Sequence, residues 1–170
     1  MNDLSGRKKL LKASRLKKGR VLDIGLGECG CMSLFLAKKG FDVVGIDNST
    51  KAIHNARKEA EKTKLKGALE VMLCNAENLF FDNNEFDAVF SYHSMHHIEN
   101  VEGVIGEMFR VCKSGGLVLV SDLRENGRKA YGHEPDKTEL LKKVEILLSR
   151  HAKDIKKLKT KKNTMFICRK

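Results

Sequence analysis

The chain has 170 residues, of which 41% are hydrophobic, and this predicts one globular domain with its own core. No apolar run approaches the length of a membrane span, and no stretch is typical of a signal peptide. Because the five cysteines are odd in number and irregularly spaced, no disulfide framework is expected. The sequence therefore predicts a cytoplasmic protein with no membrane partner.

The net charge of +11 is concentrated at the two ends of the chain. Residues 1–20 contain eight Lys or Arg and one Asp, and residues 137–170 contain twelve Lys or Arg and three acidic residues. Such ends could bind nucleic acid or an acidic partner. The alternative is that the lysines only form solvated faces.

The first elements expected along the chain are a basic amphipathic helix within residues 1–19 and then a single domain over residues 20–170. Short apolar, β-branched runs predict strands, and stretches with helical spacing lie between them. The expected strands are 20–25, 41–47, 69–74, 86–91, 117–121, 154–159 and 164–168. Residues 124–135 are expected to be a polar loop, and Asp136 with Glu139 is expected to form a capping box before the last helix.

Alternation of strands with helices predicts a parallel sheet that is covered on both faces. Right-handed crossovers would bring the carboxyl ends of the strands to one edge, where open α/β sheets bind ligands. Polar residues stand at four of these strand ends: Asp47, Asn75, Ser91 and Asp122.

A glycine turn follows the first strand and can approach a ligand closely. Gly25, Gly27 and Gly30 match G-x-G-x-x-G, with Asp47 further on, so an NAD-dependent oxidoreductase is one interpretation. However, Asp23 and Glu28 place negative charge where a pyrophosphate would lie. This favours a ligand with a cationic end.

Five segments together resemble the class I S-adenosylmethionine-dependent methyltransferases, closest to the small-molecule, ubiquinone and menaquinone branch. They are VLDIGLG (21–27), VVGIDNS (43–49), CNAENLFF (74–81), FDAVFSYHSMHHI (86–98) and FRVCKSGGLVLVSD (109–122). The resemblance implies an α/β fold, which is a Rossmann-like, doubly wound, mostly parallel seven-stranded sheet with an antiparallel terminal hairpin. It also implies S-adenosyl-L-methionine as the cofactor.

The resemblance assigns cofactor contacts along the chain. The turn around the amino acid part of the cofactor would be formed by Asp23, Gly25, Leu26 and Gly27. The ribose hydroxyls would bind Asp47, and the adenine would lie beside Asn48, Asn75, Ala76 and Glu77. The pocket near the methyl group would be lined by Ser91, Tyr92 and His93. Cys29 stands where the family commonly has a third glycine, so its side chain is expected to reshape the methionine pocket.

Methyl transfer mainly requires alignment of the acceptor with the methyl group, and a base only where the acceptor must lose a proton. His93 and His96 are the candidate catalytic residues, since histidine titrates near neutral pH. His97 is expected to hold the loop. No metal site is expected, because no carboxylate or cysteine completes a ligand set with the three histidines.

The acceptor is expected to be a small molecule, enclosed by a second subunit of a homodimer or by the basic N-terminus. The alternatives are an RNA or protein acceptor guided by the basic ends, and a non-catalytic subunit that keeps the cofactor site. Against RNA, aromatic residues are few, and Phe80, Phe81 and Phe90 are expected to be buried or partly buried.

Overall fold

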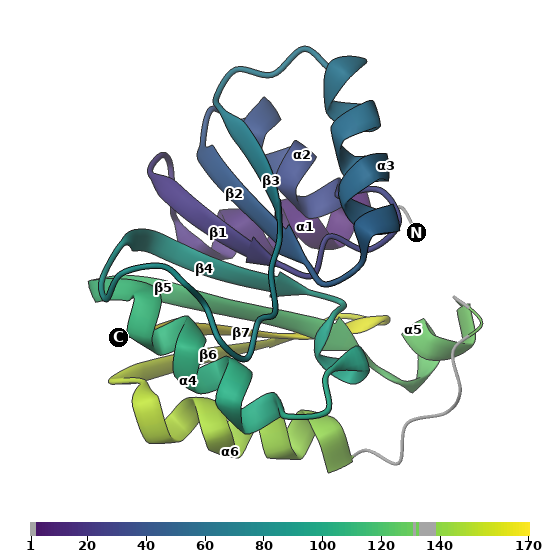
Figure 1. Cartoon of the computed structure of the whole chain (residues 1–170). Helices are drawn as coiled ribbons and strands as arrows, with labels where there is room; N and C mark the ends of the chain where they lie inside the picture. The colour runs from purple at the N-terminus through teal and green to yellow at the C-terminus, as the bar shows by residue number, and fades with distance from the viewer. Residues whose placement is uncertain (1–2, 131, 133–138) are drawn as a thin grey trace.

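A seven-stranded sheet organises the computed structural model, which describes residues 3–130, 132 and 139–170 (Figure 1). The first half of the chain contains α1 (Leu4–Ser14), β1 (Arg20–Ile24), α2 (Cys31–Lys38), β2 (Asp42–Asp47), α3 (Thr50–Glu61) and β3 (Leu69–Leu73). The second half contains β4 (Phe86–Tyr92), the 3-10 turn η1 (Met95–His97), α4 (Val101–Val111), β5 (Cys112–Leu123), α5 (Glu125–Ala130), α6 (Glu139–His151), β6 (Asp154–Lys159) and β7 (Asn163–Arg169).

The strand order is β3-β2-β1-β4-β5-β7-β6. Strands β1 to β5 are parallel to one another, whereas β7 is antiparallel to both β5 and β6. This arrangement confirms the predicted Rossmann-like sheet with an antiparallel terminal hairpin. The order reverses between β1 and β4, and ligands of open α/β sheets bind at such a point, beyond the carboxyl ends of the strands.

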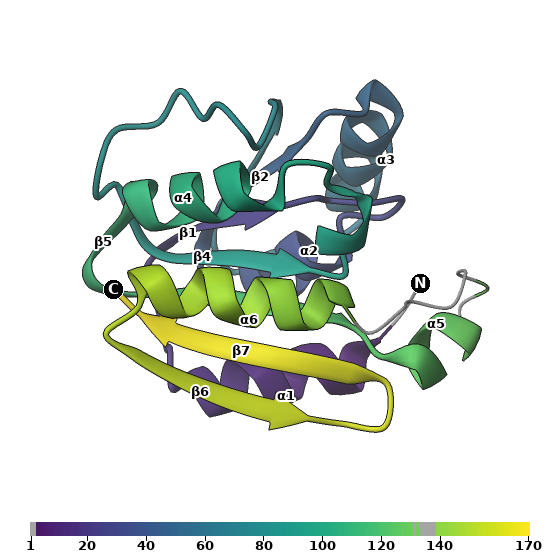
Figure 2. The ribbon, with the colours of Figure 1, turned by 90° about the horizontal axis from the view of Figure 1, so that it is seen from below.

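Helices cover both faces of the sheet and bury separate apolar clusters. On one face, the apolar residues of α4 and α6 pack against the sheet, and on the other face those of α1, α2 and α3 do so. Figure 2 shows α6 and α1 on opposite sides of the β6–β7 hairpin. Because successive side chains of a strand point to opposite faces of the sheet, neighbouring residues of one strand pack against different sets of helices.

Helix α1 packs on the sheet through Leu10, which is fully buried, while its lysines are exposed. Asp3 caps the helix, since its carboxylate accepts a hydrogen bond from the N–H of Gly6 at 3.0 Å. The chain then leaves the helix at Arg15, which has a left-handed backbone. The first residues of α1 are thereby placed over the carboxyl end of β4.

Three sequence-based expectations differ from the structure. Residues 125–130 form a helix within the expected polar loop, and its Gly127 packs closely against the backbone of Lys162. Strand β5 begins at Cys112, directly after α4, so the Ser114–Gly116 segment lies within the strand rather than in a break before it. Phe80 is 63% exposed, contrary to the expectation that it is at least partly buried. Asp136, of the expected capping box, lies outside the described residues.

Replacing Leu10 tests whether α1 is an integral part of the fold. Leu10→Ala removes a fully buried side chain and should lower the free energy of unfolding by about 3 kcal/mol in urea titrations. Leu4→Ala on the same helix is the matched control, since Leu4 is 43% exposed and its replacement should cost about 0.5 kcal/mol or less. Equal effects of the two substitutions would show that α1 does not pack on the sheet.

Candidate functional site

A cavity of about 1070 Å³ lies at the carboxyl ends of the parallel strands. Its walls come from the turn after β1, the end of β2, the loop after β3, the end of β4 and the start of α1. The volume is at the upper end of the range for small-molecule sites. The predicted strand-end ligand site therefore coincides with a real cavity.

The glycine turn after β1 is held by hydrogen bonds to the neighbouring strand. The N–H of Gly25 donates to the carbonyl of Ile46 at 2.9 Å, and the N–H of Gly27 donates to Asp47 Oδ2 at 3.1 Å. Gly25 and Gly27 have φ values of +85° and +59°, which disfavour other residues. A Cβ on Gly25 would lie 2.3 Å from Ser94 Oγ, whereas one on Gly27 would meet nothing within 4 Å. The backbone at Gly27 thus faces open space that a ligand can fill.

Asp47 joins the glycine turn to the start of α3. While Oδ2 accepts from Gly27, Oδ1 accepts from the N–H of Ser49 at 2.9 Å. Ser49 in turn caps α3, with its Oγ accepting from the N–H of Ala52. Each carboxylate oxygen keeps a further lone pair, so Asp47 can still accept hydrogen bonds from two hydroxyl groups in the cavity.

The loop after β3 supplies the polar wall next to Asn48. Asn75 Oδ1 accepts from the N–H of Glu77 at 3.0 Å, and Glu77 Oε2 accepts from Asn100 Nδ2 at 3.3 Å. These bonds order the loop without covering its cavity side. Asn48, Asn75, Ala76 and Glu77 all line the cavity, together with Gly25, Leu26, Gly27, Asp47 and Tyr92.

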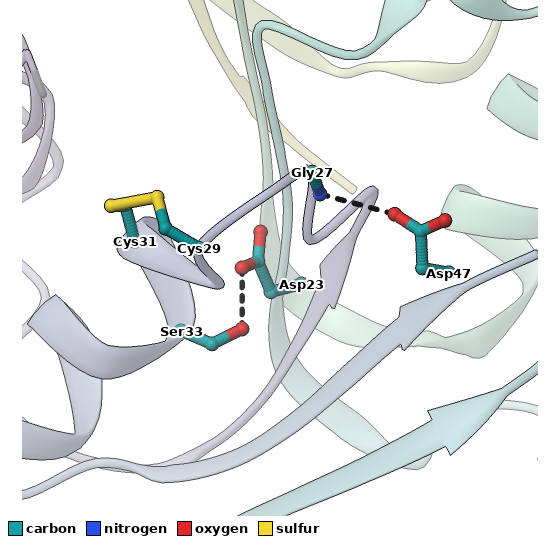
Figure 3. The surroundings of a disulfide bond; sticks show 6 residues. All are labelled: Asp23, Gly27, Cys29, Cys31, Ser33 and Asp47. Carbon is teal, nitrogen blue, oxygen red and sulfur yellow. Dashed lines mark hydrogen bonds between the residues drawn. A yellow bond between two sulfur atoms is a disulfide. The ribbon is translucent and has the colours of Figure 1, made fainter. Parts of the chain in front are cut away.

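Asp23 and Ser91, two of the expected cofactor contacts, do not line the cavity, and both are fully buried. Because side chains alternate along a strand, Asp23 points toward α2, and Ser91 points to the opposite face of the sheet. Asp23 Oδ2 accepts from Ser33 Oγ at 2.5 Å (Figure 3). Burial raises the pKa of Asp23 to about 7, although Ser33 and the nearby Arg7 oppose this.

His96, the second candidate catalytic residue, also lies away from the cavity. Its Nδ1 is 2.7 Å from Asp122 Oδ1, and its backbone N–H donates to Asp122 Oδ2 at 3.0 Å. Only 3% of the His96 side chain and 1% of the Asp122 side chain are exposed. The interaction therefore fastens η1 to the end of β5, and a catalytic contact by His96 does not fit this position. His97 lines the cavity instead.

His93 lies in the cavity wall within a polar cluster from three distant parts of the chain. Its ring stacks on Tyr92, and its Nε2 is 3.0 Å from Asn163 Oδ1 and 3.9 Å from Asp3 Oδ2. Asp3 also accepts from Tyr92 Oη at 2.8 Å and from Asn163 Nδ2 at 2.6 Å. Burial lowers the pKa of His93, even though Asp122, Asn163 and Asp3 act to raise it.

Asp3 and Arg7 are site residues that the sequence-based interpretation missed. Both line the cavity, and Arg7 is only 4% exposed. Burial on its own would raise the pKa of Asp3, but hydrogen bonds from Asn163, Gly6 and Tyr92 lower it below the ordinary value. The capping position of Asp3, three residues before Gly6, could have located the helix start but not its place over the cavity.

Cys29 and Cys31 form a disulfide beside the glycine turn (Figure 3). This differs from the expectation that the cysteine spacing would give no disulfide, because the tight turn at Gly30 brings the two side chains together. Both cysteines line the cavity, and the effect of Cys29 on the methionine pocket stays a prediction. The remaining cysteines, Cys74, Cys112 and Cys168, are free and buried.

The sequence profile described as "Methyltransferase domain" matches residues 22–120. This match covers more than half of the chain, so the protein belongs to the methyltransferase domain family. The crystal structure of a SAM-dependent methyltransferase from Aquifex aeolicus has the same fold, with a TM-score of 0.75 and 21% identity. The alignment covers 96% of this chain and 88% of that one.

Two curated relatives extend the comparison. The 24-methylenesterol C-methyltransferase 2 of Oryza sativa subsp. japonica is 36% identical over 100 residues, covering 59% of this chain and 28% of that protein. The ubiquinone biosynthesis O-methyltransferase of Pelagibacter ubique is 32% identical over 110 residues, covering 65% of this chain and 44% of that protein. The chain thus spans less than half the length of either relative. In its described part, no helix is both long and apolar enough to cross a bilayer.

The buried carboxyl of Asp23 makes stability depend on pH. Its folded-state pKa of about 7 lies above the ordinary 3.8, so the folded protein keeps a proton that the unfolded chain releases. The free energy of unfolding should therefore fall as pH rises from about 4 to 7, and stay low above pH 7.

Asp23→Asn cannot ionise and should lack this pH dependence. Its stability relative to the unsubstituted protein should increase between pH 4 and pH 8, by up to about 4 kcal/mol, in urea titrations. Asp42→Asn, at the exposed start of β2, is the control and should show no such trend. If the difference in free energy of unfolding between Asp23→Asn and the unsubstituted protein did not change with pH, Asp23 would be ionised in the folded protein throughout this range, which would contradict the prediction.

Proposed function

We propose that the protein binds S-adenosyl-L-methionine in the cavity and transfers its methyl group to a small-molecule or lipid acceptor. The observation that carries the proposal is the convergence of Gly27, Asp47 and Asn75 on one cavity at the reversal of strand order. Family membership makes this cofactor the expected one. When bound, it supplies a methyl group that is already activated on a sulfonium centre.

The cavity walls fit the parts of this cofactor in order. The open backbone at Gly27 leaves room for the amino acid part, and the free lone pairs of Asp47 suit the two ribose hydroxyls. Asn48 and the 75–77 loop would flank the adenine. Asp23 would not contact the cofactor. Its carboxylate accepts a hydrogen bond from Ser33 and so orients the start of α2.

The far end of the cavity, at Tyr92 and His93, would hold the acceptor. Because the Asp3 carboxylate only accepts hydrogen bonds, the Asn163 amide must turn its NH₂ toward Asp3 and its oxygen toward His93. His93 therefore carries its proton on Nε2, which leaves Nδ1 as the basic nitrogen. Burial lowers the pKa of His93, so the ring is neutral near pH 7 and can take a proton from the acceptor.

A small or lipid acceptor agrees with the size of the site and with the relatives. The cavity of about 1070 Å³ is large enough for more than one small molecule. The rice relative is named for a 24-methylenesterol, and the Pelagibacter ubique relative is named for ubiquinone biosynthesis. Similarity to both favours an acceptor with an apolar body, whose reacting atom would lie beside His93.

Replacing Asp47 tests the cofactor site. Asp47→Ala removes the ribose acceptor and the tie to Gly27, so affinity for S-adenosylhomocysteine should fall at least tenfold in calorimetric titrations. Asp42→Ala, at the other end of β2, is the matched control and should bind within about twofold of the unsubstituted protein. Unchanged affinity in Asp47→Ala would contradict the ribose assignment.

Replacing His93 separates methyl transfer from cofactor binding. With tritium-labelled cofactor and a panel of sterols, quinols and phospholipids, the unsubstituted protein should label at least one acceptor. His93→Gln should lower that rate about 100-fold and keep the affinity for S-adenosylhomocysteine. His54→Gln on the exposed face of α3 is the control. An undiminished rate in His93→Gln would exclude His93 as the base, and no labelling of any acceptor would favour a non-catalytic subunit.

A further inference from the structure

The five cysteines fall into two groups with different chemistry. Cys74, Cys112 and Cys168 are buried single thiols, and burial raises the pKa of Cys112 to about 11 and that of Cys168 to about 12. These three are therefore protonated and unreactive near neutral pH. Cys29 and Cys31 are joined to each other, are only partly buried, and line the cavity.

The disulfide is built into the turn that would hold the cofactor. Cys29 belongs to the glycine turn, Cys31 is the first residue of α2, and Gly30 between them has a φ of +55°. A Cβ on Gly30 would lie 2.9 Å from Ala56 Cβ, so the turn packs against α3 and cannot shift freely. Figure 3 shows the disulfide at the α2 end of the turn, with Gly27 and Asp47 at its other end.

We propose that Cys29 and Cys31 form a thiol–disulfide exchange site in the wall of the cofactor cavity. Dithiol reductants reduce this disulfide, and its redox state sets the affinity for the cofactor. This inference rests on the proposed cofactor site. Both sulfurs line the cavity and can be approached through it. Cys31 is the first residue of α2, where the positive end of the helix dipole favours a thiolate released there.

The exchange balances as two successive displacements. A thiolate of the dithiol attacks Cys29 Sγ, the bond between the two protein sulfurs breaks, and Cys31 leaves as a thiolate that takes a proton. The second thiol of the reductant then attacks the mixed disulfide and releases the Cys29 thiol. The protein gains two electrons and two protons, and the dithiol becomes a disulfide.

Cofactor binding and exchange should affect each other. A cofactor seated against the turn covers the cavity side of both sulfurs, so it should slow reduction. In the oxidised protein the disulfide holds the turn in the conformation that forms the cavity, and this preorganisation favours binding. Reduction frees the two side chains, and we expect cofactor affinity to fall about fivefold or more. The coupling is reciprocal, so bound cofactor should also favour the oxidised state.

The test combines calorimetry with mass spectrometry on the full chain. S-adenosylhomocysteine is titrated into oxidised protein and into protein treated with dithiothreitol, and iodoacetamide then labels accessible thiols. We expect weaker binding after reduction, labelling at Cys29 and Cys31, and slower labelling when S-adenosylhomocysteine is present during reduction. Cys112 and Cys168 serve as the internal control, since they are fully buried away from the cavity and should stay unlabelled in folded protein.

The double variant Cys29→Ser with Cys31→Ser separates the disulfide from other effects of the reductant. It should bind S-adenosylhomocysteine as weakly as the reduced protein does, with or without dithiothreitol. Equal affinity for S-adenosylhomocysteine in the oxidised, reduced and double-variant protein would overturn the proposal. Labelling of Cys29 and Cys31 by iodoacetamide before any reductant is added to the oxidised protein would also overturn it. Absence of S-adenosylhomocysteine binding in every form would instead refute the proposed cofactor site, while the labelling would still report on the exchange.

Discussion

The site depends on one carboxylate, that of Asp47, at the carboxyl end of β2. Asp47 accepts the N–H of Gly27 from the turn after β1 and the N–H of Ser49 at the start of α3. These two hydrogen bonds hold the turn after β1 and the start of α3 against the end of β2. The geometry works because Gly25 and Gly27 adopt backbone conformations that other residues disfavour. Without this tie, the turn would lose its fixed distance from β2, and the cavity would lose one wall.

The opposite wall, at Tyr92 and His93, is held in place by segments from both ends of the chain. Asp3 caps α1 and Asn163 begins β7, and both hydrogen bond within the cluster that contains His93. The basic N-terminal helix is therefore part of the site, while its lysines remain on the outer surface. Because the antiparallel hairpin brings β7 beside β5, Asn163 reaches His93, which follows β4, and hydrogen bonds with its ring.

Sequence patterns predicted the sheet, and they also predicted that Asp47 and Asn75 lie at one edge of it, where both line the cavity. Asp47 and Asn75 end buried strands, and parallel strands end at one edge. Ser91 also lies near the end of a strand, but its side chain is buried on one face of the sheet instead of lining the cavity. Which face a strand residue points to depends on how the strand packs against the helices, and the local sequence does not specify this. His96 likewise contacts Asp122, 26 residues away. No local pattern links Asp3 to Asn163, and the pairing of Cys29 with Cys31 depends on the left-handed backbone of Gly30 between them.

The central claim is that S-adenosyl-L-methionine binds between the glycine turn and the loop after β3. A crystal structure of the protein with S-adenosylhomocysteine tests it most directly. The account predicts both ribose hydroxyls within hydrogen-bond distance of Asp47, the adenine between Asn48 and Asn75, and the sulfur directed toward His93. A ligand bound elsewhere, or a ribose that contacts neither oxygen of Asp47, would contradict it.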